Sequence, residues 1–264
     1  MPYRRLPKTD QARIKSLEKA IELEQMDMNE IPVPFRLLNE AKTQLPLFKN
    51  LVQLYNSAFE AQVADSRKYQ TNIRNARMYI SHFIQVLNLA VIRNEIKKEH
   101  KLLYKLSPDD NTVPDLTSET SVLEWGQNII DGELERVNQG GIRLQNPNIA
   151  KVQVYYDIFK ESKVSQKIRQ QSTARTLQNV ASMRDRIDEL IKEIWDSVEA
   201  HYADLLPYER YMACRQCGII YYYRKREPEL TPKVDKDIRD NIKSTLTLDF
   251  SESDLASSGN DAEE

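Results

Sequence analysis

Residues 72–91 read NIRNARMYISHFIQVLNLAV, and residues 179–198 read NVASMRDRIDELIKEIWDSV. When the second stretch is laid under the first, apolar residues coincide, and every matched pair lies 107 positions apart. Within each stretch the apolar residues recur at spacings of three and four, which is the repeat of one face of an α-helix. A period of this length indicates a duplicated helical domain, because solenoid repeats are much shorter.

The match continues upstream of these stretches. The same shift brings the apolar positions of residues 45–52 over those of residues 152–159, and a shift of 108 matches two shorter helices further upstream. We expect the first of these helices to begin near Thr9 or Asp10 and the second near Ser118, because these side chains are good N-caps. The pattern predicts an all-α protein, an elongated helical bundle of two similar halves packed about a pseudo-two-fold axis.

The predicted halves span residues 1–110 and 111–227. In each half one stretch, residues 47–107 or 148–206, contains neither proline nor glycine, and Pro32 and Pro34 are expected to hold an extended linker before the first. Each stretch is either one long helix or a hairpin of two helices. A hairpin needs a turn, for which the candidates are the dipeptides Thr71-Asn72 and Ser172-Thr173. The absence of helix breakers favours the single long helix.

The C-terminal region has a different composition. Residues 218–224 read GIIYYYR, which predicts a short strand, and residues 101–106 are its expected partner. Residues 228–264 carry 4 basic and 10 acidic side chains, which predicts an acidic, disordered tail. Within this tail, residues 244–250 alternate like a strand and are a candidate for docking.

Composition excludes several classes of protein. The chain has 264 residues, of which 40 % are hydrophobic and 30 % charged, as is typical of proteins rich in amphipathic helix. Only 6 glycines are present, and no phosphate-binding loop, dinucleotide fingerprint or nucleophile elbow occurs. No apolar run approaches the ~20 residues of a membrane span, and the N-terminus lacks a secretory signal. We therefore expect a cytoplasmic protein that is not an enzyme, with no cofactor and no membrane or small-molecule partner.

Cys214 and Cys217 have the spacing of half a structural zinc site. A complete site needs two more ligands, and the chain offers no second such pair. Its three histidines, His82, His100 and His201, are widely separated. The two cysteines are therefore weak metal or redox candidates, and we expect them to be packing residues near the end of a helix. We expect His82 to lie at the edge of the core.

Other charged residues are interpreted as structural. Arg77 and Arg184 match between the halves, which indicates a shared ion pair or cap. Paired acidic residues are expected on solvated helix faces, because no Glu-x-x-His motif accompanies them. These pairs are Glu133 with Glu135 and Asp188 with Glu189.

Two basic stretches suggest a sharper hypothesis. Residues 66–94 and 162–184 contain Lys and Arg but no Asp or Glu. Side by side they would attract a polyanion, with an affinity that falls as salt rises. The alternative is an ordinary solvated face, which the pI of about 6.1 favours. The polyanion-binding candidates are Arg67, Lys68, Arg74, Lys163, Lys167, Arg169 and Arg175.

Three segments carry a family resemblance: Pro2–Asp10 (PYRRLPKTD), Tyr79–Val86 (YISHFIQV) and Gly218–Tyr221 (GIIY). They resemble an uncharacterised family of conserved hypothetical proteins found in Bacteroidetes bacteria, over roughly residues 2–226. The resemblance implies a bacterial, intracellular, helical protein. It implies no activity and no site residues.

The sequence therefore favours a helical scaffold or adaptor that binds a protein partner or a second copy of itself. Long amphipathic helices with few breakers often oligomerise as coiled coils. The alternative is a nucleic-acid-associated protein that binds through residues 66–94 and 162–184.

Overall fold

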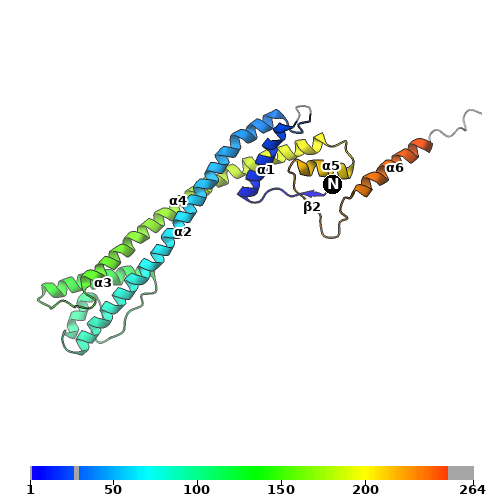
Figure 1. Ribbon diagram of the computed structural model, residues 1–264. Coiled ribbons are helices and arrows are strands. Elements are labelled where there is room, and N and C mark those ends of the chain that lie inside the picture. The colour runs from blue at the N-terminus through cyan, green and yellow to red at the C-terminus, as the bar shows by residue number, and fades with distance from the viewer. Residues whose placement is uncertain (1, 27–29, 249–264) are drawn as a thin grey trace, which may run out of the picture. The chain divides into compact units, whose positions relative to one another are not determined.

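The computed structural model of the chain describes residues 2–26 and 30–248, with side chains to residue 242. The chain is mainly helical, which confirms the all-α prediction (Figure 1). Two strands and two 3₁₀ helices, η1 and η2, accompany the α-helices. In chain order the elements are β1 Tyr3–Arg4, α1 Asp10–Glu22, η1 Leu23–Gln25, α2 Phe35–Ile92, η2 Lys98–Tyr104, α3 Glu119–Asn138, α4 Ile149–His201, α5 Pro207–Gln216, β2 Tyr221–Tyr222 and α6 Pro232–Leu248.

Each breaker-free stretch contains one long helix and not a hairpin, as the sequence favoured, but the first helix ends at Ile92, well before residue 107. α2 has 58 residues and α4 has 53, and the two helices pack together. α2 begins at Phe35, which is earlier than predicted, and it contains Pro46. An interior proline removes one helical hydrogen bond and costs about 3 kcal/mol. Apolar positions buried at helical spacing on both sides of Pro46 offset this cost, namely Leu38, Ala41, Leu45 and Phe48.

The chain forms two compact units. Unit 1 comprises Met1–Val52 and Asn179–Glu264, and unit 2 comprises Gln53–Gln178. α2 and α4 contribute residues to both units, so each unit draws on both of the halves predicted from the sequence. The boundary expected between residues 110 and 111 separates sequence repeats, and it stays a prediction. The internal duplication itself stays a prediction.

In unit 1, α1 packs with the first turns of α2 and the last turns of α4 (Figure 1). Thr9 caps α1 as predicted, because its hydroxyl accepts a hydrogen bond from the Ala12 amide at 3.2 Å. An ion pair between Glu18 and Lys49 connects α1 to α2. The core of the unit includes Leu17, Leu38, Phe48, Ile187, Ile191, Trp195 and Val198, all of them buried.

The predicted C-terminal strand is present in part, but its expected partner is wrong. β2 pairs antiparallel with β1, so that Tyr222 lies opposite Tyr3. Residues 101–104 instead belong to η2, in which Lys101 and Tyr104 are buried three residues apart. This spacing returns both side chains to the same face of a 3₁₀ helix.

The predicted disordered tail is wrong for residues 232–248, which form α6. α6 contacts α5 through Asp235. Its buried carboxylate accepts hydrogen bonds from the backbone amides of Tyr208, at 2.9 Å, and Glu209, at 3.0 Å. These amides belong to the first turn of α5, where helical amides lack partners within their own helix. The candidate strand at 244–250 is helical as far as Leu248. The rest of it, like residues 249–264, lies outside the described residues.

In unit 2, α3 packs against the end of α2 and the start of α4. Its N-cap is Ser118, as predicted, because the Ser118 hydroxyl accepts from the Ser121 amide at 3.0 Å. Gly132 lets α3 approach η2 closely, since a Cβ there would lie 2.7 Å from the Leu103 carbonyl oxygen. The core includes Ile80, Phe83, Leu87, Val122, Ile129, Tyr156 and Phe159. Across the described residues, no helix combines the length and the apolar character that a membrane span requires.

Candidate functional site

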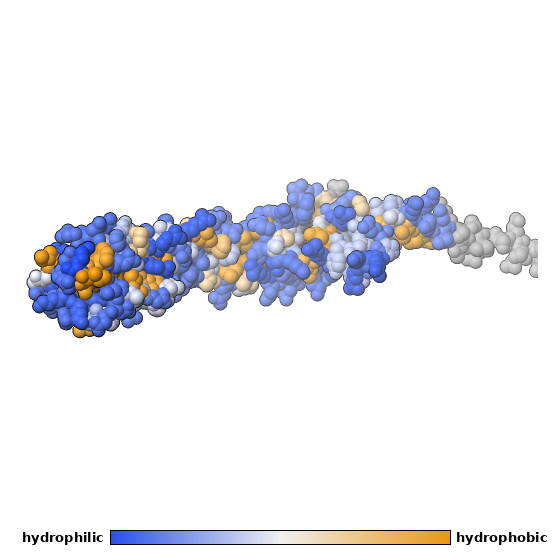
Figure 2. All heavy atoms as spheres, turned by 90° about the horizontal axis from the view of Figure 1, so that it is seen from below, coloured by the Kyte–Doolittle hydropathy of each residue, from blue (hydrophilic) through white to orange (hydrophobic). Residues whose placement is uncertain are grey.

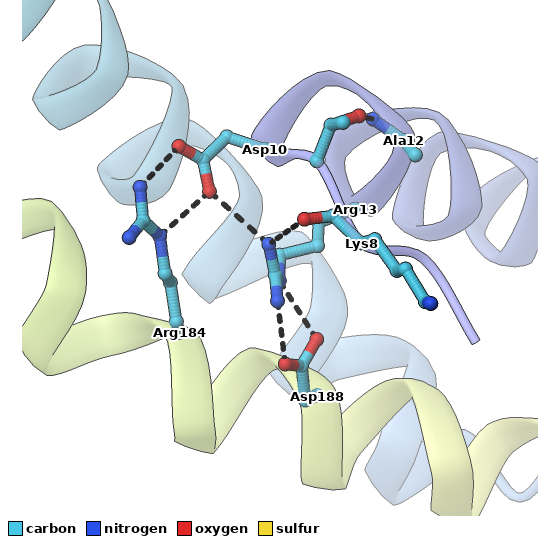
Figure 3. A network of polar contacts seen from close by, with 7 residues as sticks. Lys8, Asp10, Ala12, Arg13, Arg184 and Asp188 are labelled. Carbon is cyan, nitrogen blue, oxygen red and sulfur yellow. Dashed lines mark hydrogen bonds and ion pairs between the residues drawn. The ribbon is translucent and has the colours of Figure 1, made fainter.

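The matched arginines Arg77 and Arg184 each hold the start of a short helix. Arg184 donates two hydrogen bonds to the Asp10 carboxylate, at 2.9 and 2.7 Å, at the first residue of α1 (Figure 3). Arg77 donates to the Thr117 carbonyl at 2.8 Å, immediately before the N-cap of α3. Arg184 thus forms an ion pair, whereas Arg77 donates to a backbone carbonyl, so the two contacts are not the shared ion pair or cap that the match indicated.

Around Asp10 the contacts extend into a network of four charges (Figure 3). Arg13 donates to both oxygens of Asp188, at 2.8 and 2.7 Å, and lies 3.3 Å from Asp10. Asp188 was expected on a solvated face, but its carboxylate instead binds α1 to α4. These hydrogen bonds raise the pKa of the Arg13 guanidinium. These four side chains connect α1 to α4, and we call them the surface clasp. The surface clasp presents no group arranged for catalysis.

Glu133 was also expected on a solvated face, and this expectation is wrong. Its side chain is 1 % exposed and that of Arg136 is 2 % exposed. Arg136 donates to both carboxylate oxygens of Glu133, and Tyr104 donates its hydroxyl to the same carboxylate. Arg136 also donates to the Ile142 carbonyl at 2.7 Å. The buried charge is thus paired and hydrogen-bonded, as burial of a carboxylate requires.

The cysteine candidates lie in unit 1, at the C-terminal end of α5. Both thiols are free and buried, and burial raises the pKa of each. The Cys217 sulfur lies 3.9 Å from the Tyr202 hydroxyl. Across the described part of the chain, no group of three or more His, Cys, Asp or Glu residues is placed to hold a metal ion. Neutral, buried thiols are also poor nucleophiles and poor metal ligands.

The polyanion-binding candidates all lie in unit 2. Lys163 is paired with Glu119 at 3.4 Å, and Arg169 with Asp65 at 3.0 Å. The side chains of the other five form no ion pair with any described residue and are exposed. These five are Arg67, Lys68, Arg74, Lys167 and Arg175.

Four of the candidates form two pairs, one on each long helix, and we call these four residues the basic flank. Arg67 and Arg74 share a face of α2 because they are seven residues apart, and Lys163 and Lys167 share a face of α4 because they are four apart. Both helices also contact the start of α3. There Arg77 reaches Thr117 and Lys163 reaches Glu119.

On the outer side of α4 runs a row of exposed residues that we call the α4 stripe. Its spacing alternates between four and three, which keeps all members on one helix face. Val164 is 60 % exposed and Ile168 is 59 % exposed at its centre. On the face seen in Figure 2, apolar side chains reach the surface of unit 2, on the left, among hydrophilic ones. The stripe consists of Asp157, Glu161, Val164, Ile168, Gln171 and Arg175.

Unit 2 also contains a cavity of about 780 Å³, which we call the unit 2 cavity. The end of α2, η2 and the loop after α3 enclose it. Sequence reasoning missed this cavity, because its lining comes from residues far apart in the chain. The only local signals are Gly140-Gly141 and the spacing of Arg136 three residues after Glu133. The lining includes Val86, Leu89, Ala90, Arg93, Ile96, Lys97, His100, Arg136, Gly141, Ile142, Arg143 and Leu144.

The fold defines the class of the chain, an all-α protein with two long helices that pack together. No family model, no curated protein and no solved structure matches the chain. The family resemblance carried by the three sequence segments therefore stays a prediction.

Proposed function

We propose that the protein is a non-enzymatic helical scaffold that associates with a second copy of itself through the α4 stripe. The observation that carries this proposal is the exposure of Val164 and Ile168, one turn apart, at the centre of the stripe. Apolar residues that recur at alternating spacings of three and four form the seam of coiled coils. A two-fold pairing of identical helices would cover these side chains on both copies.

The charges of the stripe support an antiparallel pairing. When two copies of α4 are aligned so that Val164 faces Ile168, Asp157 of one copy faces Arg175 of the other, and Glu161 faces Gln171. Because the arrangement is two-fold symmetric, the attractive Asp157–Arg175 pair occurs twice. A parallel pairing in register would place Asp157 against Asp157 and Arg175 against Arg175, which is unfavourable. The stripe is thus complementary to itself in one orientation.

Sedimentation equilibrium over a range of concentrations tests the pairing. We expect the wild-type chain to form a dimer and Ile168→Asp to be a monomer, because the substitution places two carboxylates in the apolar seam. The matched control is Leu54→Asp, which changes a residue of α2 that is 51 % exposed in the same unit but outside the stripe. A monomeric wild-type chain, or a dimeric I168D variant, would overturn the proposal.

Charge exchange tests the orientation independently of the apolar residues. Asp157→Arg alone and Arg175→Asp alone each replace two attractive pairs with two repulsive ones, so both single variants should dissociate more readily. The double variant D157R/R175D restores both attractive pairs and should recover the affinity of the wild-type chain. A double variant as weak as the single variants would contradict the antiparallel register.

The basic flank supports a second candidate function, the binding of a nucleic-acid backbone. Arg67, Arg74 and Lys167 are exposed and form no ion pair with the described residues. Fluorescence anisotropy with a single-stranded DNA oligonucleotide should show affinity that falls as salt rises, and R67E/K167E should reduce both the affinity and its salt dependence. The control is Lys192→Glu, an exposed basic residue of unit 1. Equal binding by all variants would exclude this candidate.

A further inference from the structure

We propose that the unit 2 cavity binds a small organic anion, specifically a carboxylate with an aliphatic chain. The cavity of about 780 Å³ falls within the range of roughly 300–1,000 Å³ that is usual for ligand sites. This proposal is independent of the α4 stripe, because none of the stripe residues lines the cavity.

The lining contains an apolar part that is open to solvent. Leu89 is 51 % exposed and Ile142 is 86 % exposed, and both line the cavity together with Val86, Ile96 and Leu144. Such exposure of large aliphatic side chains around a concave surface is typical of a site that a ligand covers. An aliphatic chain would remove these side chains from water.

The charged residues of the lining are mainly basic, and their charges do not cancel. Arg93 is neutralised by Glu95, with which it forms hydrogen bonds of 2.7 and 3.1 Å. Lys97 and Arg143 also line the cavity, and within the described residues neither of them forms an ion pair. Because Glu95 is the one acidic residue in the lining, the cavity carries a net positive charge. An anionic head group would compensate it.

Arg136 supplies a directional group. Its side chain is 2 % exposed, and Nε and Nη2 bind Glu133, Tyr104 and Ile142. Among the described residues, Nη1 has no hydrogen-bond partner. The glycine at position 141 leaves room for Nη1, since a Cβ there would lie 2.6 Å from that atom. A guanidinium held rigidly by two of its nitrogens, with the third unbound, is suited to receive a carboxylate oxygen.

Isothermal titration calorimetry of the full chain with octanoate tests the proposal. We expect octanoate to bind, and octanol and acetate to bind at least tenfold more weakly, because octanol lacks the charge and acetate lacks the chain. Equal affinity for octanol and octanoate would overturn the anion site. The absence of any octanoate binding would overturn the site altogether.

Variants then locate the binding in the cavity. K97E/R143E should weaken octanoate binding at least tenfold by removing the excess positive charge, and Leu89→Asp should weaken it by introducing charge into the apolar wall. Lys167→Glu, exposed in the same unit but outside the cavity, is the matched control. Arg136 is left unchanged, because its removal would leave the buried Glu133 carboxylate without its counter-charge. Octanoate affinity that is unaffected in both cavity variants would overturn the proposal, and circular dichroism verifies that they are folded.

Discussion

Units 1 and 2 each hold a short helix against α2 and α4, but the polar contacts differ in their surroundings. In unit 1, α1 is clasped by Asp10, Arg13, Arg184 and Asp188, and the carboxylate of Asp188 is 34 % exposed. In unit 2, Glu133 and Arg136 of α3 bind Tyr104 of η2 and the loop after α3, and their side chains are at most 2 % exposed. Water screens charges at a surface and compensates for a lost partner, whereas a buried charge left alone stays uncompensated. The two units should therefore respond differently to the loss of one charge.

The chain allows each unit to be followed separately, since it has two tryptophans. Trp195 lies in unit 1 and Trp125 in unit 2. Fluorescence of Trp125→Phe therefore reports on unit 1, and fluorescence of Trp195→Phe reports on unit 2.

Removal of the buried carboxylate should have the largest effect. Glu133→Ala leaves the Arg136 guanidinium buried without its counter-charge, and we expect it to lower the free energy of unfolding of unit 2 by about 3–5 kcal/mol. Urea unfolding in the Trp195→Phe background measures this loss. Glu124→Ala, at an exposed position of the same helix, should change stability by less than about 0.5 kcal/mol. A loss for E133A as small as that for E124A would contradict the contrast between the units.

Removal of one charge of the surface clasp should have a smaller effect. Arg184→Ala is expected to lower the stability of unit 1 by about 1–2 kcal/mol, because it removes charge-assisted hydrogen bonds that are partly screened by water. The loss should shrink at high salt. Urea unfolding in the Trp125→Phe background, at low and high salt, checks both statements. If R184A lowered the free energy of unfolding as much as E133A does, the exposure of the charges would not determine how much stability their removal costs.

Alkaline pH should destabilise both units. Burial, followed by the hydrogen bond to Glu133, raises the pKa of Tyr104 well above its usual value near 10. The protonated hydroxyl then stabilises unit 2 below about pH 10, and this contribution is lost above it at about 1.4 kcal/mol per pH unit. Burial also raises the pKa of Tyr202 in unit 1, to about 12. Urea midpoints should therefore fall from about pH 10 upwards in both units. For unit 2, Tyr104→Phe should show a weaker dependence on pH.

Of these contacts, the one between α6 and α5 should contribute least to the stability of the protein. Asp235→Ala removes the acceptor for two amides of α5, and loss of such a cap costs about 0.5–1 kcal/mol. Hydrogen exchange should accelerate at the amides of Tyr208 and Glu209, and the amides of unit 2 should be unaffected. Asp237→Ala, an exposed neighbour on α6, is the control. Unchanged protection in D235A would exclude the carboxylate as the cap.

The sequence predicted the features that depend on local patterns. The long helices follow from apolar residues at helical spacing, and the starts of α1 and α3 follow from Thr9 and Ser118, whose hydroxyls do accept the expected amides. Features that depend on distant residues were not predictable in this way. Glu133 resembles any exposed helical glutamate until Tyr104 and Arg136 are placed around it.

The same limit explains the other differences. β2 pairs with a segment from the opposite end of the chain, and Asp235 caps a helix more than 20 residues away. The composition of residues 232–248 therefore predicted a disordered tail, because it does not reveal the contact that Asp235 makes with α5. The unit 2 cavity likewise combines the end of α2 with the loop after α3, and no local motif marks it.

The division of the chain between the units also sets an order of events during synthesis. Unit 2 is one continuous segment, Gln53–Gln178, whereas unit 1 joins Met1–Val52 to Asn179–Glu264. On the ribosome, α1 and the first turns of α2 emerge before any of unit 2. They can contact the end of α4 only after all of unit 2 has been synthesised. During this interval α4 cannot yet cover three side chains that are buried in the folded protein, namely Leu17, Leu38 and Phe48. The part of unit 1 that is made before unit 2 is therefore completed only after unit 2, and chaperones would protect this part of the nascent chain.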